Sequence, residues 1–154
     1  MKKLYMMIGI PGSGKSTWVN NQDWLKDAFY ISSDNHIDKY AISVGKTHDE
    51  VYRKYIKIAE KLVKQDVINA ISNNKDVIWD QTNTSAKVRK KKLAKFTDYY
   101  KIAVFFKVPD EAELTIRLNS RPGKSISYNT LCRMKSSLEI PTLAEGFDEI
   151  WYGG

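Results

Sequence analysis

Residues 9–17 read Gly-Ile-Pro-Gly-Ser-Gly-Lys-Ser-Thr and contain the pattern G-x-x-x-x-G-K-[ST]. Glycines let the backbone turn so that successive N–H groups point at phosphate oxygens, and the following helix adds the positive end of its dipole. Lys15 supplies a point charge for the β- and γ-phosphates, and Ser16 supplies a hydroxyl for Mg²⁺. We therefore expect an ATP-binding loop whose contacts come from Gly9, Pro11, Gly12, Ser13, Gly14, Lys15, Ser16 and Thr17.

Two aspartates follow apolar runs that predict strands. Asp34 comes shortly after residues 28–31, and Asp80 closes the run 77–79. Ligands bind at the carboxyl ends of parallel strands, so both carboxylates should face the phosphate loop. We expect Asp34 to be a general base for an attacking hydroxyl, with a helix N-cap as the alternative. We expect Asp80 to hold Mg²⁺ with Ser16 or to position the acceptor, with a turn-forming role as the alternative.

A loop with a Pro-Gly pair follows Arg121, and Arg117 lies one helical turn earlier. Phosphoryl transfer needs positive charge on the transferring group, often delivered by a mobile loop. We expect a lid around residues 120–127, with Arg121 as its catalytic and phosphate-binding residue. Arg117 is a second phosphate-binding candidate, and a plain surface position is the alternative for each arginine.

Acceptor contacts are expected from the polar residues near the two aspartates. These candidates are Thr82, Asn83 and His36, in addition to Asp80. Helix capping is the alternative for Thr82 and Asn83, and an ordinary polar helix position is the alternative for His36.

Apolar runs alternate with stretches of helical periodicity along the chain, which predicts an α/β fold. Strands are expected at residues 4–8, 28–31, 77–80, 102–106 and 147–151. Helices are expected to begin at residue 15, at a capping box of Thr47 and Glu50, and at Pro109, and to cover residues 85–97 and 128–138. The expected architecture is a parallel sheet of about five strands with helices on both faces, in one domain over residues 1–154.

The composition excludes several classes of protein. The 154 residues carry a net charge of +7 and one cysteine, which excludes an internal disulfide. No apolar run is long enough to span a bilayer and no signal peptide is apparent, so we expect a cytoplasmic protein without a membrane partner. A basic cluster at residues 87–95 is equally compatible with a solvated helix face and with nucleic-acid contact.

Some phosphate-loop classes lack their defining residues here. A GTPase needs Asn-Lys-x-Asp and Asp-x-x-Gly, and neither residues 74–77 nor residues 80–83 match. A helicase or large ATPase places an acidic residue beside the magnesium aspartate, where this chain has Gln81. The remaining class is a compact kinase that passes phosphate to an organic hydroxyl.

The chain resembles the kinase domain of phage-type polynucleotide 5′-hydroxyl kinases. The blocks that support the resemblance are residues 1–18, 29–34, 77–83 and 117–121. The resemblance implies that Lys15 contacts phosphates, Ser16 lies near the metal, Asp34 activates a 5′-hydroxyl, Asp80 organises the acceptor side and Arg121 clamps phosphates. For such a protein the location would be the cytoplasm, or the host cytoplasm if it is phage-encoded.

Two features depart from that family. The family's acceptor-gripping arginine corresponds to Ile37 here, and the chain ends without the 3′-phosphatase domain of the larger phage enzymes, whose activity we expect to be lacking. Three hypotheses follow: a kinase of DNA or RNA 5′ ends, a kinase of a nucleoside-type or modified-base hydroxyl, and a non-catalytic nucleotide-binding module with a basic RNA-binding helix. Oligomeric state is not readable from the sequence.

Overall fold

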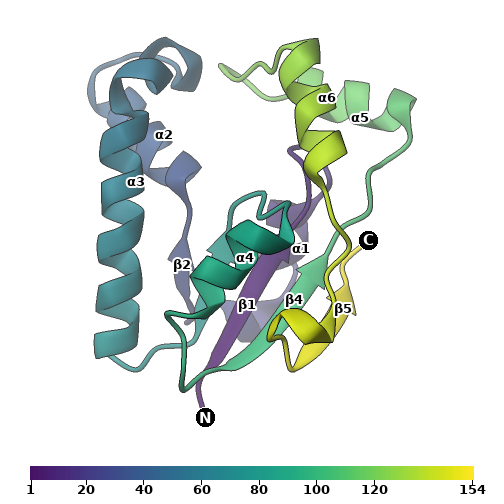
Figure 1. Cartoon of the computed structure of the whole chain (residues 1–154). Helices are drawn as coiled ribbons and strands as arrows, with labels where there is room; N and C mark the ends of the chain where they lie inside the picture. Colours follow the sequence, from purple (N-terminus) through teal and green to yellow (C-terminus); the bar gives the residue numbers. More distant parts are fainter.

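The computed structural model describes residues 1–154 and contains one five-stranded parallel sheet (Figure 1). The strands are β1 (Lys3–Ile8), β2 (Phe29–Ile31), β3 (Val77–Asp80), β4 (Tyr100–Phe105) and β5 (Glu149–Tyr152), in the spatial order β2-β3-β1-β4-β5. The predicted parallel α/β sheet is therefore confirmed. The strands β2 and β3 lie on one side of β1, and β4 and β5 lie on the other side. In parallel sheets, ligands bind at the carboxyl ends of the strands where the strand order reverses in this way.

Six α-helices and two short 3₁₀ helices connect the strands. They are α1 (Lys15–Asn20), η1 (Asp23–Leu25), α2 (Ser33–Ser43), α3 (His48–Ser72), α4 (Ala86–Leu93), α5 (Glu111–Asn119), α6 (Tyr128–Ser137) and η2 (Leu143–Glu145). The capping box of Thr47 and Glu50 is present at the start of α3, as predicted. The predicted basic helix over 85–97 is shorter than expected, because α4 ends at Leu93. None of these helices is both long and apolar enough to cross a bilayer.

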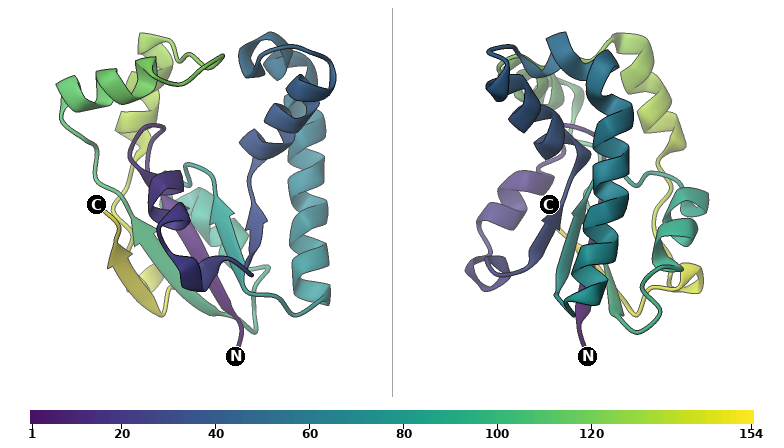
Figure 2. Two further views of the ribbon diagram at one scale, coloured as in Figure 1. Left: turned by 180° about the vertical axis from the view of Figure 1, so that it is seen from behind. Right: turned by 90° about the vertical axis from the view of Figure 1, so that its left-hand side faces the viewer.

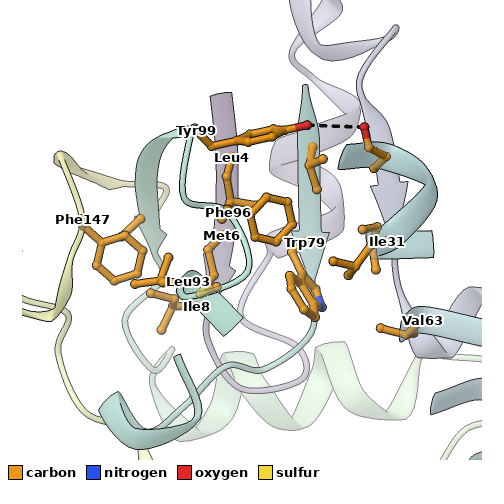
Figure 3. Packing of buried hydrophobic residues seen from close by; sticks show 14 of the residues in the cluster. Leu4, Met6, Ile8, Ile31, Val63, Trp79, Leu93, Phe96, Tyr99 and Phe147 are labelled. Carbon is orange, nitrogen blue, oxygen red and sulfur yellow. Dashed lines mark hydrogen bonds between the residues drawn. The ribbon is translucent and has the colours of Figure 1, made fainter. Parts of the chain in front are cut away.

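Alternate residues of β1 face two separate apolar clusters. Leu4, Met6 and Ile8 pack with α3, α4 and the segment after α4, and this larger cluster is shown in Figure 3. Tyr5 and Met7 pack on the other face with α1 and η1. This alternation follows from the two-residue period of a strand and confirms that helices cover both faces of the sheet.

A third apolar cluster holds α2 against α3, away from the sheet. Ile37 is fully buried there together with Ala41, Val51 and Ala59. The aromatic rings of Tyr40 and Tyr55 lie 4.2 Å apart beside it. This pair of helices forms a wall beside the carboxyl ends of the strands (Figure 1).

Candidate active site

The phosphate loop lies between β1 and α1, with Gly12 and Gly14 in the left-handed region at φ 81° and 101°. Only glycine adopts such angles without strain, which explains both glycines of the motif. The Nζ of Lys15 donates hydrogen bonds to the carbonyl oxygens of Gly9 at 2.8 Å and Ile10 at 3.0 Å. The loop therefore curls around its own lysine.

Charged groups from three other segments lie near Lys15. Burial lowers the pKa of Lys15, which nearby Asp80 and Asp34 raise and nearby Arg121 lowers further. All four groups line one cleft of about 1310 Å³. Its walls include residues 11–18, 32–35, 80–82 and 124–127. The structure thus brings together the predicted residues Lys15, Asp34, Asp80 and Arg121.

Asp80 is buried at the end of β3 and receives two hydroxyl donors. Ser16 Oγ donates to Asp80 Oδ2 at 3.2 Å, and the hydroxyl of Tyr30 donates to the same oxygen. Burial and the charge of Asp80 raise the pKa of Tyr30, so the phenol stays protonated and remains a donor. The structure thus brings the oxygen atoms of Ser16 and Asp80 together, and oxygen ligands are the kind that Mg²⁺ prefers.

Asp34 lies in the first turn of α2 and is not its N-cap. The N-cap is Ser32, whose side chain accepts a hydrogen bond from the N–H of Asn35, so the capping alternative for Asp34 is wrong. The carboxylate of Asp34 is 55% exposed, lines the cleft and has its Oδ1 3.1 Å from Nε2 of His48. It is therefore accessible to a bound hydroxyl.

The lid segment (residues 120–127) connects α5 to α6 and reaches across to the start of α3 (Figure 2). The N–H of Asp49 donates to the carbonyl of Gly123 at 3.0 Å, and Ser125 Oγ donates to Asp49 Oδ2 at 2.7 Å. Lys124 forms an ion pair with Asp38 at 3.0 Å. The lid is thus docked on the far wall of the cleft.

Arg117, at the end of α5, and Arg121, in the lid segment, have different partners. Arg117 lines the cleft as well, but it forms an ion pair with Glu113 at 2.8 Å and donates to the carbonyl of Gly12 at 3.1 Å, so its guanidinium already supports the phosphate loop. Arg121 forms no ion pair, and its Nε is buried without a hydrogen-bond partner. A buried donor without a partner is costly, which favours Arg121 as the arginine reserved for a bound anion.

Two of the acceptor candidates do not reach the cleft. His36 points at Asp66, with its Nε2 2.6 Å from Oδ2 of that residue. Asn83 is buried and donates through Nδ2 to the carbonyl of Met7 at 2.7 Å. Both predictions are corrected, since these side chains are already used within the fold. Thr82 does line the cleft, and the helix-capping alternative for Thr82 and Asn83 fails because Ser85 caps α4.

The basic cluster at residues 87–95 is less exposed than a solvated face would be. Arg89 is fully buried, where Nε and Nη2 bind the two oxygens of Glu145 at 2.7 and 3.1 Å. Lys92 donates to Gln81 Oε1 and Asn83 Oδ1, and burial lowers its pKa to about 8. The remaining exposed lysines of the cluster are Lys87, Lys90, Lys91 and Lys95.

Several cleft residues were not among the predicted ones. Tyr30, His48, Tyr52 and Arg53 all line it. The signal for Tyr30 was its place in a short strand, two residues before the polar residues that begin at Ser32. The last three lie on the first turns of α3, and no local pattern marks them, because only the packing of α3 on α2 turns that face toward the phosphate loop.

The chain matches the family model described as AAA domain over residues 4–141. It belongs to this family. The match spans the sheet except β5 and includes every predicted site residue. The family name describes a nucleotide-binding scaffold and does not by itself fix the reaction.

Several solved kinase structures share the fold of this chain. A presumed kinase from Chloroflexus aurantiacus is similar with a TM-score of 0.72 and 16% identity, over 98% of this chain and 84% of that one. A chain of the Pnkp1/Rnl/Hen1 RNA repair complex gives a TM-score of 0.63 and 24% identity, over 89% of this chain and 44% of that one. Shikimate kinase from Aquifex aeolicus gives a TM-score of 0.55 and 17% identity, over 97% of this chain and 86% of that one. At these identities the likeness shows the fold, which is that of phosphate-loop kinases.

Among curated proteins, the mouse heterogeneous nuclear ribonucleoprotein U-like protein 2 is 24% identical over 169 residues. The match covers 98% of this chain but only 21% of that protein. The chain therefore spans about a fifth of the length of this relative.

Proposed function

We propose that this chain is an ATP-dependent polynucleotide kinase that transfers the γ-phosphate of ATP to a 5′-hydroxyl of DNA or RNA. The observation that carries the proposal is the shared cleft, in which Lys15 of the phosphate loop is electrostatically coupled to Asp34 and Arg121. A phosphate-binding loop, a carboxylate and a cation are the three groups that phosphoryl transfer to an alcohol requires.

In the proposed step, Asp34 accepts the proton of the acceptor hydroxyl while the alcohol oxygen bonds to the γ-phosphorus. The bond from that phosphorus to the β–γ bridging oxygen breaks, and ADP leaves with the electron pair. Lys15 and Arg121 stabilise the negative charge on the transferring group, since fixed positive charge acts strongly in a partly desolvated cleft. The carboxylate of Asp34 remains open to the cleft, which suits proton transfer.

Magnesium fits the oxygen atoms near Ser16. Ser16 Oγ would be a direct ligand, and Asp80 would act through water, because no group of three or more His, Cys, Asp or Glu side chains is gathered for a protein-only cage. When bound with ATP, the ion would neutralise charge on the β- and γ-phosphates. Tyr30 and Ser16 both hold Asp80 in place for this role.

A polyanionic acceptor is supported by charge in and around the cleft. The net charge of the chain is +7. Arg53 lines the cleft and takes part in none of the ion pairs of the structure. Ile37 is fully buried between α2 and α3, so Arg53 is the better placed residue to meet an acceptor phosphate. One of the similar structures is a chain of an RNA repair complex, which is a further reason to favour a nucleic-acid acceptor.

A small-molecule hydroxyl is the second candidate. Position 37 carries a buried isoleucine instead of a cationic side chain, which favours this candidate. The similarity to shikimate kinase favours it as well. Both candidates share the donor site and differ only in what meets Asp34 and Arg53.

An acceptor screen with labelled ATP and Mg²⁺ tests the proposal. Single-stranded DNA and RNA with a 5′-hydroxyl should gain label, and the same strands carrying a 5′-phosphate should not. Free nucleosides and shikimate should be much poorer acceptors. Label on a small alcohol but not on oligonucleotides would favour the second candidate, and label on no acceptor despite ATP binding would favour a non-catalytic module.

A further inference from the structure

His48 lies between two carboxylates, although nothing in the sequence marks it as a functional residue. Its Nε2 is 3.1 Å from Oδ1 of Asp34, and its Nδ1 is 3.4 Å from Oδ1 of Asp49. The imidazole is only 10% exposed and packs against the ring of Tyr52, with ring centroids 5.7 Å apart. Because His48 is the first residue of α3, the capping box of Thr47 and Glu50 fixes the backbone from which it projects.

The second carboxylate belongs to the docking site of the lid. Asp49 binds the lid twice, through its N–H to Gly123 and through Oδ2 to Ser125. Burial acts to raise the pKa of Asp49, but the hydrogen bonds from Ser125 and His48 outweigh it and leave the pKa below its ordinary value. The lid hydroxyl and the imidazole therefore both favour the charged form of the same carboxylate.

These contacts form one continuous chain from Ser125 through Asp49 and His48 to Asp34, in which each ring nitrogen donates to one carboxylate when the imidazole carries both protons. Figure 1 shows the loop between α5 and α6 extending toward the corner where α2 meets α3. Asp34 has no other side-chain hydrogen bond, so His48 is what limits the rotation of its carboxylate. A base that rotates freely spends little time in the geometry that proton transfer needs.

Resting on the proposed function, we propose that His48 is a positioning residue that orients the Asp34 carboxylate toward the acceptor hydroxyl when the lid is docked on Asp49. The lid would then serve two purposes, since it brings Arg121 to the phosphates and fixes the base through Asp49 and His48.

Steady-state kinetics with the two amide variants of His48 test the first half of the proposal. The Nε2 of glutamine takes the place of the imidazole Nε2, whereas the amide of asparagine lies near the position of Nδ1. His48→Ala should lower kcat about ten- to a hundredfold while the Kd for ATP stays within about twofold. His48→Gln should recover most of that loss, and His48→Asn should not. Equal kcat for the glutamine and asparagine variants would overturn the proposal.

The second half of the proposal, that the docked lid acts through Asp49 and His48, is tested by combining His48→Ala with Ser125→Ala. Two residues that act through one chain of contacts should give a combined loss smaller than the product of the single losses. A combined loss equal to the product would show that the lid and His48 act independently.

The chain offers a matched control in its other histidine. His36 also pairs with an aspartate, Asp66, but lies outside the cleft. His36→Gln should keep wild-type kcat, and a loss equal to that of His48→Ala would show that any lost His–Asp pair has this effect. Wild-type protein without transfer to any hydroxyl would overturn the proposed function, whereas wild-type turnover matched by His48→Ala would overturn this inference alone.

Discussion

The phosphate loop (residues 9–17) and the lid segment (residues 120–127) face each other across the cleft, but they are held by contacts of very different range. Lys15 of the phosphate loop bonds to Gly9 and Ile10, six and five residues away. The lid depends on Asp49 and Asp38, as Ser125 lies 76 residues from the first and Lys124 lies 86 from the second.

We expect this difference to separate ATP binding from turnover. A locally built loop can bind nucleotide phosphates whenever β1 and α1 are in place, whereas the lid is in place only when α5, α6 and the α2–α3 corner are assembled. The lid contacts are also polar and exposed or only partly buried, so they should open at a lower free energy than the core does. We therefore expect changes in the phosphate loop to abolish ATP binding and changes in the lid to affect turnover first.

The largest expected effect comes from Lys15→Ala. The variant removes the cation of the phosphate loop, so both ATP binding and transfer should fall, with kcat/KM reduced by about a thousandfold or more. Calorimetric titration with ATP and an acceptor assay measure the two losses. Wild-type affinity for ATP in this variant would show that the loop does not bind the phosphates through Lys15.

Arg121→Ala should leave ATP binding largely intact and lower kcat by about a hundred- to a thousandfold, since its charge is needed in the transition state. Arg117→Ala is the matched variant four residues earlier. It should have a smaller effect, because Arg117 is occupied by Glu113 and the carbonyl of Gly12. The reverse order of the two kcat values would make Arg117 the lid residue.

Gly123→Ala tests the docking of the lid by steric means. A Cβ at Gly123 would lie 2.8 Å from Cβ of Thr47, so the lid would have to lift away from α3. We expect about a tenfold loss of kcat with unchanged ATP affinity.

Gly45→Ala is the control for this lid variant. Gly45 has nearly the same φ, 67° against 70°, but a Cβ there meets nothing within 4 Å. It should cost about 1 kcal/mol of stability without changing kcat. Equal kcat losses in the two alanine variants would mean that backbone strain, not lid docking, is being measured.

The smallest effect is a pH dependence of stability behind the cleft, at Lys92. Its pKa of about 8 in the folded protein lies below its ordinary value of 10.5, so between these values the unfolded chain binds more protons than the folded one. The free energy of unfolding of the wild type, relative to that of Lys92→Met, should therefore rise as the pH increases through this window, by on the order of 2 kcal/mol. Urea unfolding from pH 7 to 10 measures the difference, and the exposed neighbour variant Lys91→Met should show no such change relative to wild type.

The sequence predicted those parts of the molecule that depend on short-range patterns. The phosphate loop, the strand ending at Asp80 and the capping box of α3 are all confirmed, because the residue types at each place impose the local backbone. Asp34 also lies where the end of β2 was expected to place it.

The remaining features depend on partners far along the chain. Arg89 belongs to a run of basic residues that the sequence suggests are exposed. Its burial is explained only by its ion pair with Glu145, 56 residues later. His36 seemed a candidate because it follows Asp34 closely, yet the helix turns it toward Asp66. His48 was hidden for the opposite reason, since its neighbour in space is 14 residues away in sequence.

The most direct test of the account is Asp34→Asn, which keeps the size of the side chain and a hydrogen-bonding oxygen but removes the base. ATP should bind within about twofold of wild type, and transfer to a 5′-hydroxyl oligonucleotide should fall by about a hundred- to ten-thousandfold. Wild-type turnover in this variant, or loss of ATP binding together with turnover, would contradict the assignment of Asp34 as the base that faces the phosphate loop.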